Sequence, residues 1–124
     1  MSQVNYATQV AANATVFPLN NTSLERVKGF GFLTVYGRQE ATAAGELVLD
    51  VYQNDERVVD SATMARNDSM QPNKSDDIIA GPLPCIPDQY IRAVLREIAG
   101  AAMDLRVTFE FTPASMQEVA AAIH

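Results

Sequence analysis

Residue types that could serve as nucleophile and base are scarce in this sequence, which has one cysteine, Cys85, and one histidine, His124. Cys85 stands between Pro84 and Ile86, with no histidine or basic residue beside it to lower the pKa of the thiol. We therefore expect Cys85 to be buried and inert. His124 is the last residue of the sequence, a position that suits a general base poorly. The sequence predicts no catalytic residues and hence no enzyme.

Carboxylates are the remaining residues that could form a site. Asp55, Glu56 and Asp60 flank one predicted hairpin, and Asp76 and Asp77 open a predicted strand. A hard cation needs several oxygen ligands that converge from one loop; the Asp-x-Asp-x-Asp-Gly pattern is missing, so solvated turns are the preferred interpretation. Two carboxylates would suffice for a glycosidase, but sugar clefts usually need aromatic platforms, and the sequence has no Trp and four Tyr. Because the cation-binding pattern is missing, no metal is expected. No cofactor is expected either, because the sequence has no phosphate-binding glycine loop.

Length and composition indicate a single globular domain. The 124 residues are 48% hydrophobic and 19% charged, which is enough apolar material for one core. The formal net charge is −6 and the nine Lys and Arg residues are scattered, which argues against a nucleic-acid partner because neutralising phosphates needs clustered cations. No apolar run approaches the ~20 residues that span a bilayer, so no membrane partner is expected. The lone cysteine and a start without a signal-like pattern are typical of synthesis in a reducing cytoplasm.

The middle of the sequence shows the alternation of antiparallel β-strands. Around residues 30–37, aromatic and polar side chains share one face and small or aliphatic residues the other, which indicates a strand packed closely on one side: Phe30, Phe32, Thr34 and Tyr36 against Gly31, Leu33, Val35 and Gly37. A hairpin is predicted from Glu46 to Met64, with its turn at residues 53–56. In its first strand the alternation directs Leu47, Leu49 and Val51 into the core, and Glu46 and Asp50 away from it.

The C-terminal half contains one ambiguous segment. Residues 76–80 are predicted as a short strand, and the prolines that follow (Pro82, Pro84 and Pro87) exclude a helix or a central strand, leaving a stiff crossing segment. Residues 88–99 fit a helix by the spacing of Ile91, Val94, Leu95 and Ile98, and fit a strand by the alternation of Ile91, Ala93 and Leu95. The strand is favoured, because the alternating run from Leu105 to Phe111 needs a partner. Ser115 and Glu118 then form a capping box that begins a short C-terminal helix.

The N-terminal segment, residues 1–28, is polar, and Pro18 interrupts any long element. It is predicted as an extended arm that is ordered against a neighbour, and residues 29–124 as the β-sandwich domain with the C-terminal helix. In a second interpretation the arm includes a first strand of the sandwich at Val16 and Phe17. The isolated apolar residues of the arm are the candidate partner-binding residues: Val4, Tyr6, Val10, Val16 and Phe17.

The order of these segments resembles a jelly-roll sandwich: a polar N-terminal arm, seven or eight short strands, the segment Ile-Pro-x-x-Tyr-Ile-Arg at 86–92 and the closing strand at 105–111. The expected fold is thus mainly β, an antiparallel β-sandwich of jelly-roll type. With no cysteine pairs, signal or catalytic set, the chain resembles the small capsid decoration (cement) proteins of tailed bacteriophages. That resemblance implies a homo-oligomer on the capsid surface of the virion, made in the host cytoplasm. It would bind the major capsid protein or other shell subunits and stabilise the shell.

A second class of function fits the same sandwich, namely a small ligand-binding module for carbohydrate or peptide. Such a module needs an exposed aromatic patch, for which Tyr36, Tyr52 or Tyr90 are the candidate anchors.

Overall fold

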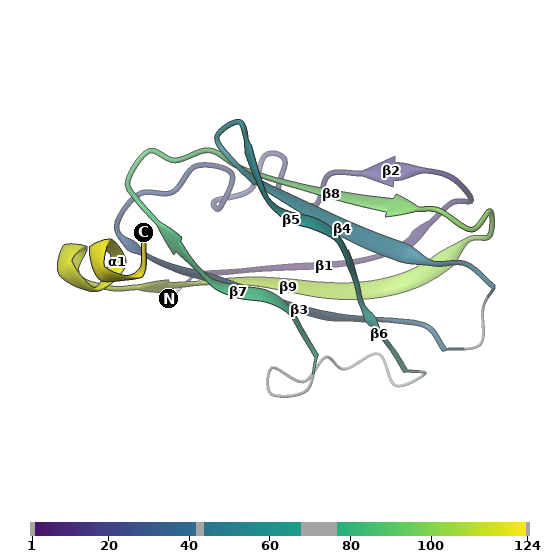
Figure 1. Cartoon of the computed structure of the whole chain (residues 1–124). Helices are drawn as coiled ribbons and strands as arrows, with labels where there is room; N and C mark the ends of the chain where they lie inside the picture. The colour runs from purple at the N-terminus through teal and green to yellow at the C-terminus, as the bar shows by residue number, and fades with distance from the viewer. Residues whose placement is uncertain (1, 42–43, 68–76, 124) are drawn as a thin grey trace.

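The computed structural model describes residues 2–41, 44–67 and 77–123. This part of the chain forms nine strands and one short helix (Figure 1). In chain order they are β1 (Ser2–Val10), β2 (Thr15–Val16), β3 (Gly31–Gln39), β4 (Leu47–Gln53), β5 (Glu56–Thr63), β6 (Ala65–Arg66), β7 (Ile78–Cys85), β8 (Ile91–Glu97), β9 (Met103–Pro113) and α1 (Met116–Ala122).

The strands form two sheets that lie over one another, a β-sandwich with α1 at one end (Figure 1). Sheet A has the order β1-β9-β3, and β3 pairs in addition with both β7 and β6. Sheet B has the order β2-β8-β4-β5. All of these pairs are antiparallel except the short parallel contact between β3 and β6. The predicted mainly-β sandwich with a short C-terminal helix is therefore confirmed.

The core lies between the two sheets and is built from the inward-facing residues of the long strands. Leu47, Leu49 and Val51 of β4 are fully buried, and β5 pairs with β4 from Val48↔Thr63 to Gln53↔Glu56. This confirms the predicted hairpin and its core face. The partners across the core include Leu33 and Val35 of β3, Leu95 of β8, and Leu105, Val107 and Phe109 of β9.

Two glycines of β3 allow β9 to approach closely. A Cβ atom at Gly31 would collide with the Thr112 carbonyl and the Phe111 ring, and one at Gly37 would collide with the Arg106 carbonyl. The close packing predicted from the glycine positions is thus present, and β9 is the strand that uses it.

The ambiguous segment is a strand: β8 pairs with β4 from Leu47↔Glu97 to Gln53↔Ile91. Residues 78–80 form a strand, as predicted, whereas residues 81–85 differ from the expected crossing segment, because β7 continues through Pro82 and Pro84. Proline is tolerated there because β7 pairs with β3 alone in the described chain, and a strand edge needs no N–H donor on its outer side. The capping box is formed, with the Glu118 amide donating to Ser115 Oγ and the Ser115 amide donating to the Glu118 carboxylate.

The N-terminal segment lies differently from the predicted arm. β1 pairs with β9 over its whole length, from Ser2↔Phe111 to Val10↔Met103, so residues 2–10 are a strand of sheet A. The reason is physical: without β1, β9 would have an open edge, and the half-buried Val4 and Tyr6 would lose their contact with the core. The alternative first strand exists only in part, as the two-residue β2, which pairs with β8.

Asp50 also departs from the expected pattern, because the outward face of β4 is buried as well. Its carboxylate is 4% exposed and accepts hydrogen bonds from Arg96 Nε (3.0 Å) and from the Ser61 amide (2.7 Å). Arg57 completes the group at 3.8 Å. A central strand covered by these arginine side chains can bury a carboxylate because every oxygen has a donor.

Glu97, at the end of β8, fastens the loops at one end of the sandwich. Its carboxylate accepts hydrogen bonds from five backbone amides at 2.7–3.1 Å: Asn13, Glu46, Ala99, Gly100 and Ala101. These hydrogen bonds lower the pKa of Glu97 to about 2, with the Asn13 amide as the largest cause and burial acting in the opposite direction. One side chain thus joins the β1–β2 turn, the start of β4 and the β8–β9 turn.

Leu49→Ala should cost about 2–5 kcal/mol of unfolding free energy, the range for a cavity in a packed core, because Leu49 is fully buried. Urea unfolding measures this loss. The control is Thr63→Ala on the exposed side of β5, which should change the value by less than about 0.5 kcal/mol. Equal effects of the two substitutions would show that the core lies elsewhere.

Glu97→Gln should lower stability at pH 7 and flatten its dependence on pH. A carboxylate whose pKa falls from 4.5 to about 2 on folding stabilises the fold above pH 4.5, and this contribution is lost as the pH falls from 4.5 toward 2. Urea midpoints at pH 7 and pH 3 should therefore differ less for Glu97→Gln than for the unmodified chain. The charge-matched control, Glu56→Gln in the exposed β4–β5 turn, should leave that difference unchanged; equal pH dependence in both variants would contradict the assignment.

Candidate functional site

The only cysteine is fully buried, as predicted. Burial raises the pKa of the Cys85 thiol to about 11, although hydrogen bonds from Gln53 and the Leu33 backbone act in the opposite direction. The thiol also lies 3.4 Å from the Leu83 carbonyl, which can accept its hydrogen bond. His124 is outside the described residues. Cys85 therefore has the environment of a core side chain.

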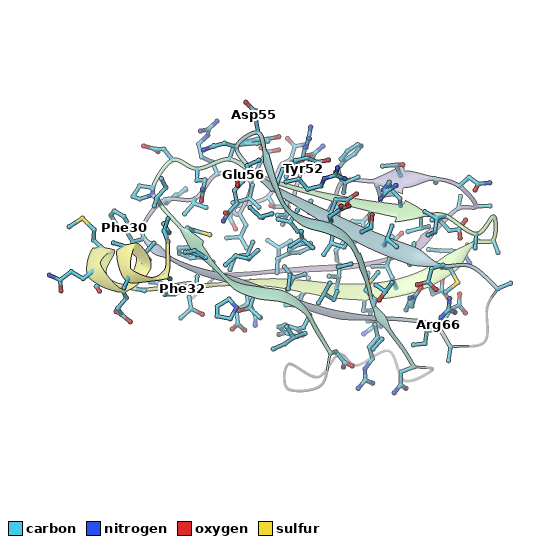
Figure 2. All side chains as sticks on the ribbon, viewed as in Figure 1. Phe30, Phe32, Tyr52, Asp55, Glu56 and Arg66 are labelled. Carbon is cyan, nitrogen blue, oxygen red and sulfur yellow. The ribbon has the colours of Figure 1, made fainter. Side chains whose placement is uncertain are left out.

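The acidic residues predicted as possible site formers are dispersed. Asp55 and Glu56 lie at the exposed tip of the β4–β5 hairpin (Figure 2), and Asp60 accepts a hydrogen bond from Arg57 at 3.2 Å. Asp76 is outside the described residues, and Asp77 is buried in an ion pair with Arg38 at 2.6 Å. Within residues 2–41, 44–67 and 77–123, no three His, Cys, Asp or Glu side chains are grouped as metal ligands.

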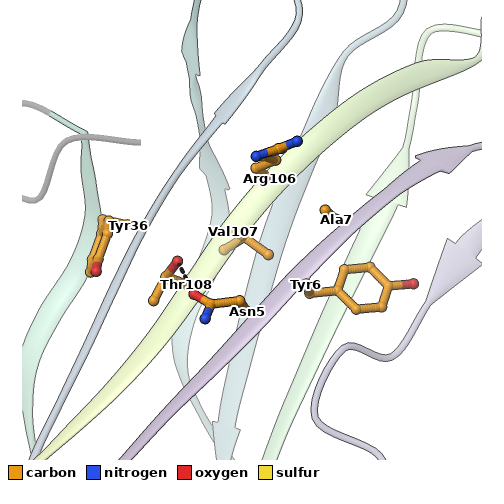
Figure 3. Close-up of a pocket in the computed structure, with 7 residues that line it drawn as sticks. All are labelled: Asn5, Tyr6, Ala7, Tyr36, Arg106, Val107 and Thr108. Carbon is orange, nitrogen blue, oxygen red and sulfur yellow. Dashed lines mark hydrogen bonds between the residues drawn. The ribbon is translucent and has the colours of Figure 1, made fainter. Parts of the chain in front are cut away.

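A shallow depression of about 290 Å³ crosses the outer face of sheet A (Figure 3). It is lined by residues of β1, β3 and β9: Asn5, Tyr6, Ala7, Tyr36, Arg106, Val107 and Thr108. The Thr108 hydroxyl donates to Asn5 Oδ1 at 2.8 Å, whereas the Tyr6 ring points away from this pair (Figure 3). Arg106 is exposed, and its guanidinium makes no hydrogen bond or ion pair with any described residue. The depression thus offers a free guanidinium, an amide and one phenol ring to a small polar ligand.

The outer face of sheet B carries an arginine–tyrosine surface, which comprises Tyr52, Tyr90, Arg26, Arg57 and Arg92. Arg92 lies 4.2 Å from the centre of the Tyr52 ring and Arg57 lies 5.9 Å from it. Arg26 lies 5.7 Å from the Tyr90 ring. These distances are those of cation–π contacts. The surface therefore presents positive charge and aromatic area for binding.

The three tyrosines predicted as ligand anchors are therefore divided between the sheets. Tyr36 borders the depression on sheet A (Figure 3), and Tyr52 lies on the outer face of sheet B (Figure 2). Tyr90 precedes β8, where the Asn54 amide donates to its carbonyl at 2.7 Å. No single aromatic patch unites all three.

The candidate partner-binding residues differ in what they can offer to a partner. Val10 is fully buried, which makes it a core residue, because its place opposite Met103 lies between the sheets. Val4, Tyr6 and Val16 are half-buried against the core. Phe17, at 46% exposed, is the large apolar residue of this set that is exposed. Contact of these residues with a partner stays a prediction.

Two features of possible function were not found from the sequence. The first is the outer edge of β1, whose backbone pairs with β9 on one side only within the described chain. The second is a groove of about 400 Å³ between β5, β7 and α1, whose lining is partly polar, from Gln53, Glu56 and Gln89, and partly apolar, from Val58, Leu83, Ile86 and Ile123. Ile86 and Ile123 are 40% and 49% exposed there. Both features depend on strands that meet only in the folded chain.

Cys85 should resist a thiol reagent such as dithionitrobenzoate at pH 8 in the native protein, because it is buried and its pKa is about 11. In urea the same thiol should react fully at a rate normal for an exposed cysteine. Reaction of the native protein at the unfolded rate would contradict the buried position. The variant Cys85→Ala controls for reagent consumption by other groups.

Among the described helices, none has the length and apolar character needed to cross a membrane. Comparison of the chain with protein-family models finds no match, and neither the curated proteins nor the solved structures give a significant match.

Proposed function

We propose that this chain is a non-enzymatic structural protein of a virion, a decoration (cement) protein that binds the capsid surface and stabilises the shell through contacts between subunits. Its partners would be the major capsid protein or other shell subunits. The observation that carries the proposal is the order of the strands in the two sheets.

That order supports a jelly roll. The chain crosses between the sheets at each step from β1 to β4. The later strands β8 and β9 are then inserted between these earlier strands. In sheet A, β9 lies between β1 and β3; in sheet B, β8 lies between β2 and β4. With β7 as the fourth strand of sheet A, this order supports an eight-stranded jelly roll, an architecture that occurs in viral capsid domains and in lectins. The step from this architecture to a shell is an analogy between folds.

The interior adds support of a different kind. The buried carboxylates of Asp50, Asp77 and Glu97 have hydrogen-bond donors, and the Cys85 thiol is a core group. In the described residues, no buried side-chain nitrogen or oxygen lacks a hydrogen-bond partner. A rigid sandwich whose buried polar groups are satisfied leaves its outer surface for function, which suits a shell-binding protein.

A second function is favoured by the depression on sheet A. Arg106, Asn5 and Tyr36 could hold a sugar or a peptide carboxylate there, and lectins also use the jelly roll. A glycan array separates the two functions. Binding that is abolished by Arg106→Ala would favour the ligand-binding module over the shell protein.

Sedimentation tests the proposed function. In a nuclease-treated lysate of cells that produce the native particles, the chain should sediment with the particles. Phe17→Asp should weaken this attachment without changing the melting temperature, because Phe17 is exposed. Deletion of residues 2–12 is unsuitable as a test, since it would remove β1 from the sheet.

The matched control is Thr63→Asp, which adds the same charge on the exposed side of β5 and should sediment like the unmodified chain. The shell proposal fails if the full-length chain stays at the top of the gradient while the particles sediment. If Phe17→Asp sediments normally, Phe17 is excluded as a contact.

A further inference from the structure

The strand edges of this sandwich are not equally protected. Exposed edges invite pairing with another strand, and folded proteins block them with charges, prolines, bulges or short length. β5, the edge of sheet B, carries charged residues and two register shifts, with Ser61 at a positive φ of 51°. β7 contains Pro82 and Pro84 and is irregular in its pairing with β3. β2 and β6 have two residues each.

β1 has none of these devices. Its nine residues, Ser-Gln-Val-Asn-Tyr-Ala-Thr-Gln-Val, contain no charge, no proline and no glycine. Its register with β9 is continuous, without a bulge. In a strand, alternate residues direct their N–H and C=O groups to opposite sides, so half of the backbone groups of β1 face away from β9. Within the described chain, no loop backbone donates to or accepts from residues 3–9.

We propose that the outer edge of β1 pairs with β1 of a second copy of this chain, antiparallel and about a two-fold axis. Sheet A would then continue across both copies. Such an interface is isologous, because each copy contributes the same residues. The pairing is measured on the isolated protein and does not depend on the proposed shell.

Charge is the reason to choose a second copy as the occupant. The chain has a formal charge of −6, so most approaches of two copies bring like charges together. β1 is a long edge strand without charged residues, so pairing two copies of it brings no like charges together. It therefore allows two acidic chains to approach through a neutral strand.

The sequence of β1 is also compatible with antiparallel pairing to a second copy of itself. When Tyr6, the middle residue, lies on the axis, Val4 stands opposite Thr8 on the inner face. On the outer face Gln3 stands opposite Gln9, and Asn5 opposite Ala7. Each pair is uncharged, and the half-buried Tyr6 rings of the two copies meet at the centre. The apolar inner row of sheet A then continues into the second copy.

Light scattering coupled to size-exclusion chromatography tests the pairing. The full chain should elute with twice its mass of 13.5 kDa. The double variant Asn5→Lys with Ala7→Lys places lysine opposite lysine twice, and should raise the dimer dissociation constant about tenfold or more, a change of ~1.4 kcal/mol or more. Mixing it with the variant Asn5→Asp with Ala7→Asp should restore the doubled mass, because opposite charges then face each other.

The control variant, Thr63→Lys with Ala65→Lys, adds the same charges at exposed positions of β5 and β6 and should remain dimeric. A monomeric full chain at all concentrations overturns the proposal, as does a dimer that the β1 lysines leave intact or that the control variant breaks. Should the lysine variant fail to fold, hydrogen exchange on the unmodified chain decides. The outward amides of β1 should exchange more slowly at high than at low protein concentration, and equal rates overturn the pairing.

Discussion

The buried carboxylate of Glu97 is the constraint on which the two-sheet arrangement depends. A sandwich whose chain crosses repeatedly between sheets has several connections at each end, and their backbone amides need acceptors once they are buried. Glu97 supplies these acceptors to five amides from three connections. Backbone hydrogen bonds add to this attachment, because the Ile98 amide donates to the Glu46 carbonyl and the Glu97 amide donates to the Ala14 carbonyl, both at 3.0 Å. The charge is tolerated at 3% exposure because each oxygen is fully occupied.

Gln39 plays the corresponding neutral role between the sheets. Its side chain, fully buried at the end of β3, donates to the Met64 carbonyl at 3.0 Å and accepts from the Leu47 amide at 2.9 Å. Sheet A is thereby joined to the first residue of β4 and to the connection that leads from β5 to β6. Gln39 and Glu97 thus both accept hydrogen bonds from backbone amides at the start of β4. The hairpin β4–β5 is held at one end by polar bonds and along its length by the core.

The parts of the fold that the sequence predicts are those with local causes. The period-two pattern of β4 and of residues 105–111 places the core residues, and the capping box at Ser115 and Glu118 begins the helix without help from the rest of the chain. Residues 91–97 are different, because their spacing also suits a helix. Their strand form is imposed by pairing with β4 on one side and β2 on the other, which are non-local contacts.

The features that depend on residues far apart in the sequence were not predicted. They include the β1 edge and the hydrogen bonds to Glu97. Val4, Tyr6, Thr8 and Val10 do recur at every second residue, but an edge strand has one paired side and polar neighbours, so its pattern resembles that of a polar arm. The donors to Glu97 come from residues 13, 46 and 99–101, which no sequence window brings together.

The distribution of charge separates the surfaces that can bind a partner from those that maintain the monomer. On sheet B, Arg57 and Arg96 neutralise Asp50, so much of that positive charge is committed to the fold. On sheet A, Arg38 is committed to Asp77 in the same way. The groups that remain available to a partner include Arg106 above the depression, Arg92 on Tyr52, and the neutral backbone of β1. Of these, β1 alone offers a continuous row of hydrogen-bonding groups, and so it can bind a strand through its backbone, with the side chains deciding which strand fits.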